Sequence, residues 1–282
     1  MSGKFKIRTM ERSEIDFAIE LAAKEGWNPG LHDAEPFYSA DNAGFLIGLL
    51  DDKPIACISA VSYENEFGFI GFYIVVPEYR GKGYGIQIWN AAIDKLKNHN
   101  IALDGVFAQQ DNYRKSGFKF AYSNIRYEWI NTGGNLKADG IVPISSLEIE
   151  KIIDYDKKIF PADRSNFLTD WLKMPDSFSY AVLVNETING YGVIRKCRSG
   201  FKIGPLFADD AKTAESLFLR LTSSIEKNIP VYLDVPEVNL EAMDLARKYK
   251  MKNVFGAARM YTGDIPDISV ERTYGVTTFE LG

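Results

Sequence analysis

Apolar and polar positions along the chain predict alternating strands and helices in two successive sets. The first set opens with a short strand at 5–10 and a helix at 13–25, where apolar residues recur at spacings of three and four. The glycines and proline of 26–30 end that helix. Further strands are expected over 44–50, 55–63, 67–76, 103–108 and between 118 and 129, with a helix at about 83–98.

The second set repeats this plan after a polar, glycine-rich stretch. Asn131-Thr132-Gly133-Gly134-Asn135 is the best candidate for a linker. We therefore divide the chain into a first domain at 1–130, a linker at 131–140 and a second domain at 141–282. Strands are expected at 141, 179–184, 190–197, 200–207 and 231–235, and helices at 145–159, 164–174, 211–227 and 239–249.

Short residue pairs recur between the two sets at a nearly constant offset. Ile70-Gly71 matches Ile203-Gly204 and Arg126-Tyr127 matches Arg259-Met260, both 133 residues apart. Leu103-Asp104 matches Leu233-Asp234 at an offset of 130. Chance matching of short apolar segments is the alternative, but order and spacing agree as well as residue type. The simplest interpretation is a duplicated fold, with copies of normal domain size.

Composition narrows the classes of function. The chain has 282 residues, 46% of them hydrophobic and 25% charged, and 33 Lys+Arg against 38 Asp+Glu give a net charge of −5. This acidic balance argues against nucleic-acid binding, which needs a basic face. Two cysteines and two histidines predict neither a disulfide framework nor a metal site. The longest apolar run, 69–76, is too short to span a membrane, and no secretory signal is present, so we expect a cytoplasmic protein.

The sharpest chemical signal follows the apolar strand that ends at Val76. Arg80 and three alternating glycines, Gly81, Gly83 and Gly85, come before a predicted helix. Glycines let a backbone approach a ligand closely, and the free N–H groups at a helix start attract anions such as a pyrophosphate. The spacing is that of neither a Walker loop nor a Rossmann fingerprint.

Arg-x-x-Gly-x-Gly after a strand resembles the acetyl-CoA-binding motif of the GNAT N-acetyltransferase superfamily. The resemblance implies an α/β (α+β) fold of two tandem GNAT-like domains, each a mixed, mostly antiparallel twisted sheet flanked by helices. It also implies that acetyl-CoA pairs with the strand end and that loop amides hold its pyrophosphate. The implied cofactor-binding residues are Ile74, Val75, Val76, Arg80, Gly81, Lys82, Gly83, Tyr84 and Gly85.

A second family feature is a tyrosine four residues before a Gly-Phe pair, here Tyr113 before Gly117-Phe118. The family role of this tyrosine is the general acid that protonates the departing thiolate. A phenol with a pKa of ~10 holds its proton at pH 7. Packing beneath the sheet is the alternative. The segment before Tyr113 is about one helical turn shorter than its counterpart before Ala246, which leaves the aim of the hydroxyl open.

The second set of elements lacks these features. At the 133-residue offset, Arg80, Gly83 and Gly85 correspond to Thr213, Ser216 and Phe218, and the counterpart of Tyr113 is Ala246. We therefore expect one cofactor site, in the first half. The group of two-domain GNAT proteins that the chain resembles is matched by residues 25–30, 114–118, 203–206, 234–236 and 279–282.

In a GNAT fold the acceptor enters past the first two helices and the loop between them. An amine must lose a proton before it attacks, and the candidates for the carboxylate that takes it are Glu25, Asp33, Glu64 and Glu66. Trp27, Asn28 and Glu64 are candidates for contact with the substrate. Helix-end solvation and ordinary packing are the alternatives for these residues.

Together these features predict an acetyl-CoA-dependent N-acetyltransferase that acts on a primary amine of a small molecule or peptide. No metal, nucleic acid or membrane partner is expected, and a homodimer is possible. One alternative is a non-catalytic acyl-CoA-binding sensor or scaffold. Another is an aminoacyl- or peptidyl-transferring enzyme, although this acidic chain has no basic tract for tRNA.

Overall fold

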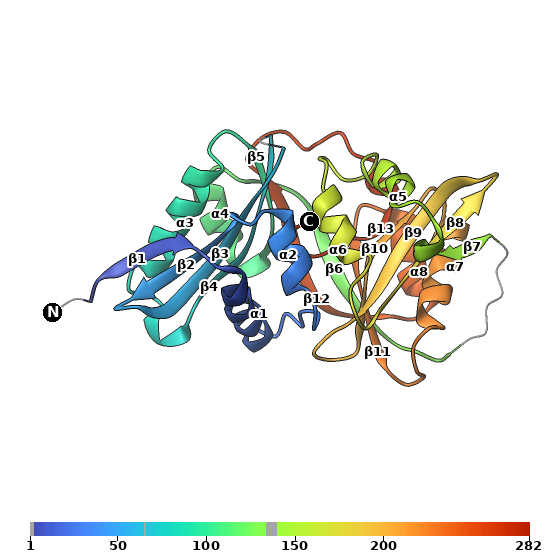
Figure 1. Cartoon of the computed structure of the whole chain (residues 1–282), viewed down its shortest axis with the longest axis horizontal. Helices are drawn as coiled ribbons and strands as arrows, with labels where there is room; N and C mark the ends of the chain where they lie inside the picture. The colour runs from blue at the N-terminus through green and yellow to red at the C-terminus, as the bar shows by residue number, and fades with distance from the viewer. Residues whose placement is uncertain (1–2, 65, 134–139) are drawn as a thin grey trace.

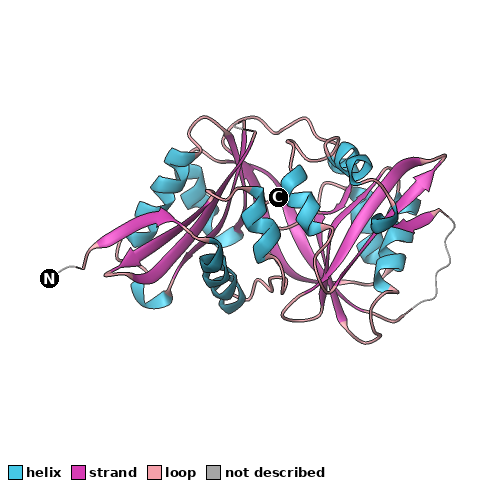
Figure 2. Cartoon of the chain, in the orientation of Figure 1, coloured by secondary structure: helices cyan, strands magenta, loops and turns pink. Residues whose placement is uncertain are grey.

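One continuous mixed sheet runs through both halves of the molecule (Figure 1). The computed structural model describes residues 3–64, 66–133 and 140–282. Within them the sheet has 13 strands, in the order β1-β2-β3-β4-β5-β12-β6-β11-β10-β9-β8-β7, with β13 paired to β10. Helices flank the sheet (Figure 2), so the predicted class, a mixed and mostly antiparallel sheet covered by helices, is confirmed.

The first half follows the predicted order closely. Its elements are β1 (Phe5–Thr9), α1 (Ile15–Lys24), α2 (Ala34–Ala40), β2 (Phe45–Leu50), β3 (Lys53–Tyr63), β4 (Phe67–Val75), α3 (Tyr84–Lys95), β5 (Asn100–Val106), α4 (Gln110–Lys115) and β6 (Lys119–Ile130). The apolar face predicted for the first helix is buried in α1. The pattern analysis missed α2 and α4, which are only seven and six residues long. Helices this short carry little periodicity.

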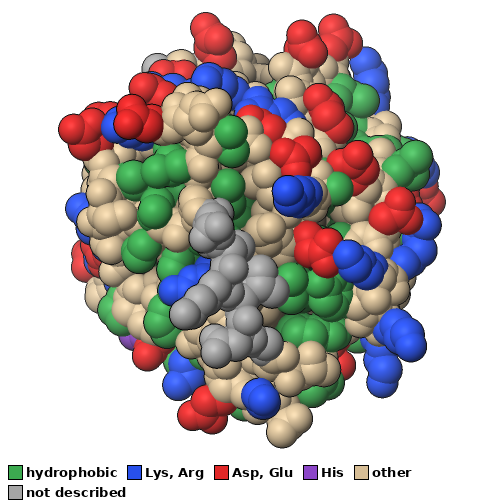
Figure 3. All heavy atoms as spheres, turned by 90° about the vertical axis from the view of Figure 1, so that its right-hand side faces the viewer, with side chains coloured by type: hydrophobic (Ala, Val, Ile, Leu, Met, Phe, Trp, Pro, Cys, Tyr) green, Lys and Arg blue, Asp and Glu red, His purple; other side chains and the backbone are tan. Residues whose placement is uncertain are grey.

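The second half repeats the arrangement. Its elements are β7 (Ile141–Pro143), α5 (Ile149–Asp156), α6 (Ser165–Trp171), β8 (Ser177–Val184), β9 (Thr187–Lys196), β10 (Phe201–Ala208), α7 (Ala211–Thr222), β11 (Pro230–Pro236), α8 (Leu240–Lys248), β12 (Lys252–Tyr261) and β13 (Thr273–Gly275). Among the described helices, none is long and apolar enough to cross a membrane. On the outer face of this half, charged side chains of both signs are scattered between apolar ones (Figure 3).

Most of the predicted linker, residues 134–139, lies outside the described residues. Of its described part, Asn131 is fully buried. Its side-chain amide donates to the carbonyl oxygens of Thr222 and Glu226 at 3.0 and 2.8 Å. The chain is therefore anchored to the end of α7 immediately after β6. The domain boundaries stay a prediction.

The two halves exchange their last long strands. β6 of the first half pairs with β11, and β12 of the second half pairs with β5, so the two strands cross between the halves. They also pair with each other, and Asn124 lies opposite Ala257, its counterpart at the 133-residue offset of the repeat. An approximate twofold axis therefore passes through this pair. Neither half can complete its sheet without the other.

Two buried ion pairs stabilise the exchanged strands, and both are formed by residue types that recur in the two halves. Arg259 of β12 donates to Asp104 of β5, with Nε to Oδ1 at 2.8 Å and Nη2 to Oδ2 at 2.7 Å. Arg126 of β6 makes the equivalent bidentate pair with Asp234 of β11, at 2.7 Å for both bonds. Burial opposes the charge on Asp234, but the field of Arg126 outweighs it and lowers the pKa of that carboxyl group. Each half thus supplies the arginine that neutralises the other half's aspartate.

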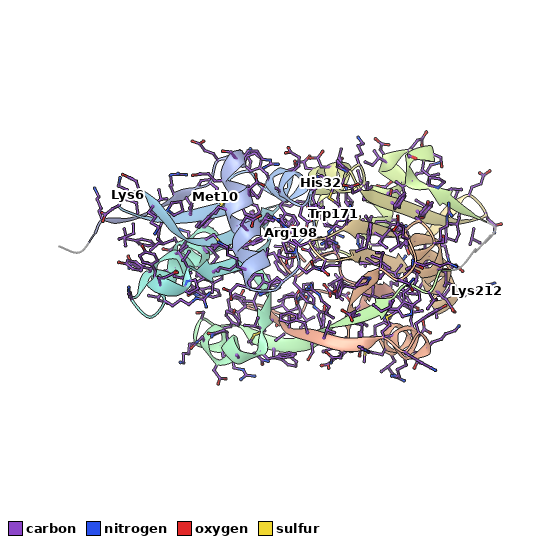
Figure 4. All side chains as sticks on the ribbon, turned by 90° about the horizontal axis from the view of Figure 1, so that it is seen from below. Lys6, Met10, His32, Trp171, Arg198 and Lys212 are labelled. Atoms are coloured by element: carbon purple, nitrogen blue, oxygen red, sulfur yellow. The ribbon has the colours of Figure 1, made fainter. Side chains whose placement is uncertain are left out.

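Aromatic packing between α2 and α6 adds to the contact between the halves. The rings of Phe37 and Trp171 stack with centroids 6.1 Å apart, and both side chains are fully buried. The guanidinium of Arg195 lies 4.4 Å from the Trp171 ring and pairs with Asp33 at 2.9 Å. Figure 4, seen from below, places Trp171 near the middle of the molecule.

Asp234→Asn is expected to destabilise the protein by about 3–5 kcal/mol, because it leaves Arg126 buried without its counter-charge. The pKa of Asp234 is lowered in the folded state, so its contribution is present above its unfolded pKa of ~3.9 and is lost as the pH falls. Urea unfolding between pH 3 and 7 measures both effects. Asp244→Asn, in the exposed pair with Arg247, is the control and should change stability little. Equal effects of the two variants would contradict the strand-exchange argument.

Candidate active site

The site begins where β4 and β5 separate. Their parallel pairing ends at Ile70 and Leu103. β4 then bulges against β3, and Phe72 takes a positive φ of 49° within the bulge. A bulge bends its strand and increases the local twist. The two strands therefore diverge and leave a cavity of about 460 Å³ between them.

Both halves contribute to the walls of this cavity. First-half residues are Glu25, Trp27, Ile70, Gly71, Phe72, Tyr73, Ile74, Val75, Arg80, Gly81, Gly85, Trp89, Leu103, Asp104, Gly105, Val106, Gln109, Tyr113 and Arg126. Second-half residues are Phe255, Phe279 and Glu280. The predicted strand end, glycine loop and tyrosine therefore meet in one place, together with side chains more than 120 positions away in the sequence.

The glycine loop leaves the start of α3 open. Gly81 and Gly83 have φ values of 73° and 82°, where a side chain would be strained, and the space around each is empty. Gly83 is the N-cap of α3, and no side chain caps the helix. The first N–H groups of α3 are therefore free to bind an anion. At Gly85 the constraint is space and not backbone conformation. A Cβ there would lie 2.8 Å from the Tyr73 hydroxyl.

Arg80 connects the loop to α1 and to the cavity. Its Nη2 contacts the carboxylate of Glu25, and its Nε donates to the carbonyl oxygen of Val75 at 2.7 Å. Glu25, predicted as a catalytic carboxylate, lines the cavity but is neutralised by this pair. Lys82, Gly83 and Tyr84 lie outside the lining. Lys82 donates to the Glu78 carbonyl oxygen at 2.8 Å, and the Tyr84 ring packs on Phe5 at 4.8 Å.

The edge of β4 that faces away from β3 borders the cavity at Val75. The N–H of Val76 donates to the carbonyl oxygen of Ile55 at 2.9 Å, so it is already used. Hydrogen bonds alternate along an antiparallel strand, so the Val75 N–H points to the opposite edge, where β5 has diverged. Of the three predicted strand residues, Ile74 and Val75 line the cavity and Val76 does not.

Tyr113 lies on α4 with its ring packed against Trp89, at a centroid distance of 5.5 Å. It is 9% exposed and lines the cavity. A Cβ at Gly105 would lie 2.2 Å from its ring, so the glycine makes room for the tyrosine beneath β5. Burial and, to a smaller extent, the nearby Tyr73 raise the pKa of Tyr113 to about 12. The hydroxyl therefore keeps its proton at neutral pH.

Of the predicted acceptor-side residues, Glu25 and Trp27 line the cavity, but Asp33, Asn28 and Glu64 do not. Asp33 is buried in its pair with Arg195 and also accepts from the Gly30 N–H at 2.8 Å. The side chain of Asn28 makes two hydrogen bonds with the backbone of Ser199. Glu64 is exposed in the turn after β3 and accepts from the Asp163 N–H at 3.2 Å. These three positions fasten the two halves together.

The sequence analysis assigned no role in the site to Arg126, Phe255, Phe279 or Glu280. Arg126 and the tail 279–282 were noted only as a repeated residue and a group motif. Arg126 donates to the Trp27 carbonyl oxygen at 2.8 Å, and its guanidinium lies 4.8 Å from the Phe279 ring and 5.6 Å from the Phe255 ring. Only the strand exchange and the path of the 276–282 segment bring these groups together, so local pattern could not have revealed them.

Glu280 is the most distinctive of these groups. It is 4% exposed, and its carboxylate accepts no hydrogen bond from any described residue. Burial raises the pKa of Glu280, although Lys202 and Arg126 act in the opposite direction. Its backbone packs over β4, because a Cβ at Gly71 would lie 2.2 Å from the Glu280 carbonyl oxygen.

The corresponding space in the second half is filled by the chain itself. The parallel pairing of β10 and β11 ends at Ile203 and Leu233, and β13 then pairs with β10 on the far side of that point. The Val276 N–H donates to the Asp234 carbonyl oxygen at 2.9 Å. At the start of α7, Asp210 accepts from the Thr213 N–H at 2.8 Å, so the protein's own carboxylate caps this helix. The second half therefore has no open counterpart of the cavity among the described residues.

No cluster of His, Cys, Asp or Glu within the described ranges could hold a metal ion. The start of α3, the end of β4 and Glu280 all border this cavity.

Each half of the chain matches a known family. Residues 11–118 match the acetyltransferase (GNAT) family, and residues 152–275 match an acetyltransferase (GNAT) domain. The chain is 30% identical over 269 residues to a holothin acyltransferase from a Pseudoalteromonas strain, an alignment that covers 95% of this chain and 92% of that protein.

Two solved structures are similar in fold. One is a proposed acetyltransferase from Pyrococcus horikoshii, with 22% identity, a TM-score of 0.84 and coverage of 99% of this chain and 96% of that one. The other is a tandem GNAT protein from the clavulanic acid biosynthesis pathway, with 9% identity, a TM-score of 0.64 and coverage of 93% and 100%. The chain therefore belongs to the GNAT acetyltransferase family as a tandem member, and it is an acyltransferase of the kind that uses an acyl-CoA co-substrate.

Proposed function

We propose that this protein is an acetyl-CoA-dependent N-acetyltransferase that acetylates a primary amine of a small molecule or peptide. The observation that carries the proposal is the single cavity in which an uncapped helix start, a strand-edge amide and a protonated tyrosine are arranged along diverging strands. Acetyl-CoA supplies the acetyl group as a thioester. The family membership supports acyl transfer, and the choice of acetyl group and amine is the proposed part.

The loop and the strand end bind and orient the co-substrate in this proposal. The open N–H groups of α3 hold the pyrophosphate, with the left-handed Gly81 and Gly83 allowing close approach. The Val75 N–H donates to the thioester carbonyl oxygen and stabilises the negative charge that develops there during attack. Arg80 orients the loop through the Val75 carbonyl oxygen and Glu25.

Tyr113 completes the transfer. The amine nitrogen forms a bond to the carbonyl carbon, the carbon–sulfur bond breaks, and the phenol donates its proton to the departing thiolate. A buried tyrosine with a pKa of about 12 is fully protonated throughout the neutral range, so its hydroxyl carries the proton that the thiolate needs. The amine must also lose a proton, which requires a separate base.

Acetyl-CoA at about 100 times its Kd is expected to stabilise the wild-type protein by about 2.7 kcal/mol, measured as a shift in Tm. Gly83→Glu should abolish that shift, because it places a carboxylate where the pyrophosphate binds. Gly83→Ala tests the strain of a left-handed residue without the charge. Gly117→Glu is the matched control, since Gly117 also has a positive φ of 91° and open space around it. Loss of the shift in the Gly117 variant alone would contradict the site.

Tyr113→Phe is expected to lower kcat by about 10²-fold and to leave the Kd for acetyl-CoA unchanged, because it removes the proton donor and keeps the ring on Trp89. Steady-state kinetics and isothermal titration calorimetry measure the two quantities. Tyr73→Phe is the control, because Tyr73 lines the same cavity and also packs on Trp89, at 5.1 Å. Unchanged kcat in the Tyr113 variant with a loss in the Tyr73 variant would move the general acid to Tyr73.

A further inference from the structure

We propose that the second-half wall of the cavity is the acceptor subsite, which binds a primary amine on a flat apolar body and places its nitrogen against Glu280, the general base. This inference rests on the proposed function and deepens it. The second-half wall consists of Phe255, Phe279 and Glu280, with Trp27 and Arg126 from the first half beside them.

Glu280 is the carboxylate of the cavity that remains available. The lining contains three carboxylates within the described residues, Glu25, Asp104 and Glu280. Glu25 is paired with Arg80, and Asp104 with Arg259 and with the side-chain amide of Asn124 at 2.7 Å. A buried carboxylate is normally paired or hydrogen-bonded, because desolvation of its charge is costly. An unpartnered one at the edge of a cavity points to a partner that arrives with the substrate.

The surroundings of Glu280 set its basicity. Lys202 of β10, Arg126 of β6 and Arg195 of β9 favour its charged form, while Asp33 and burial oppose it. Arg126 and Arg195 are each neutralised by their own aspartates, Asp234 and Asp33. The balance raises the pKa of Glu280, which makes the carboxylate a stronger base than an exposed glutamate.

The remaining wall is aromatic and carries no unpaired charge. The rings of Phe255 and Phe279 lie 6.1 Å apart, and the guanidinium of Arg126 stacks on Phe279 while its charge is held by Asp234. Aromatic faces and a stacked guanidinium favour flat, polarisable ligands. An amine on such a body would bury its ring against this wall and direct its nitrogen to the one free carboxylate.

For an amine that reaches the site in its neutral form, the protons of the transfer balance between Glu280 and Tyr113. The Glu280 carboxylate takes one proton from the amine as the nitrogen–carbon bond forms. Tyr113 gives one proton to the sulfur as the carbon–sulfur bond breaks. Because Glu280 belongs to the second half and Tyr113 to the first, both halves take part in the reaction.

The test measures thiol release from acetyl-CoA in the full-length protein, with tryptamine and 2-phenylethylamine as flat acceptors and 2-cyclohexylethylamine and ethanolamine as comparisons. Wild type should prefer the flat amines. Glu280→Gln should lower kcat/KM by about 10²- to 10⁴-fold while the acetyl-CoA Kd stays within twofold. Glu280→Asp, which keeps the carboxylate, should recover part of the loss. Glu241→Gln, outside the cavity, is the control.

The pH profile separates a base from a structural role. In wild type, kcat/KM should rise with pH through the raised pKa of Glu280, since only the ionised carboxylate accepts a proton. In Glu280→Gln this rise of kcat/KM with pH should be absent. A wild-type Tm, and the same increase in Tm when acetyl-CoA is added, would show that the variant is folded.

Each other result has a definite meaning. If Glu280→Gln acetylates the amines with the same kcat/KM as wild type, Glu280 is not the general base. If wild type prefers 2-cyclohexylethylamine or ethanolamine, the proposed class of flat acceptors is wrong. If wild type binds acetyl-CoA and acetylates none of the amines, the proposed function falls, and the subsite with it.

Discussion

The reciprocal exchange of β6 and β12 is the constraint on which the rest of the structure depends. Each strand completes the sheet of the opposite half and carries an arginine that neutralises a buried aspartate there, Arg259 on Asp104 and Arg126 on Asp234. A buried carboxylate without its counter-charge is costly, so the halves are bound to each other electrostatically as well as through the sheet. The same two strands form part of the cavity, which ties the geometry of the site to the stability of the exchange.

Duplication produced two similar frameworks that now serve different purposes. The residues after Tyr261 run back along both. They cover Gly204 with the carbonyl oxygen of Thr277 and Gly71 with that of Glu280, and these glycines are equivalent in the repeat. In the second half the segment fills the space between the diverging strands. In the first half it stops at one wall and leaves room for a ligand. The segment after Tyr261 therefore fills the space in the second half and contributes Phe279 and Glu280 to the wall of the first-half cavity.

Charges explain the contrast at the helix starts. Asp210 fills the anion position at α7 with its own carboxylate, whereas α3 begins at Gly83, which has no side chain to offer. A helix N-terminus attracts whichever anion is present, either from the protein or from a ligand. The family match in each half therefore describes a common fold, while the local chemistry at the helix start differs between the two copies.

The sequence by itself determined most of the elements, though not α2, α4 or β12, together with the duplication, the glycine loop and the tyrosine motif. Periodicity, turn residues and motif spacing are local properties of the chain. It also located Glu25 and Trp27 at the cavity. It could not assign Asp33 and Asn28 to the contact between the halves, or Arg126, Phe255 and Glu280 to the site. Those assignments depend on which strands exchange and where the last segment runs, and only the tertiary structure decides them, because the partners lie about 100 residues or more apart along the chain.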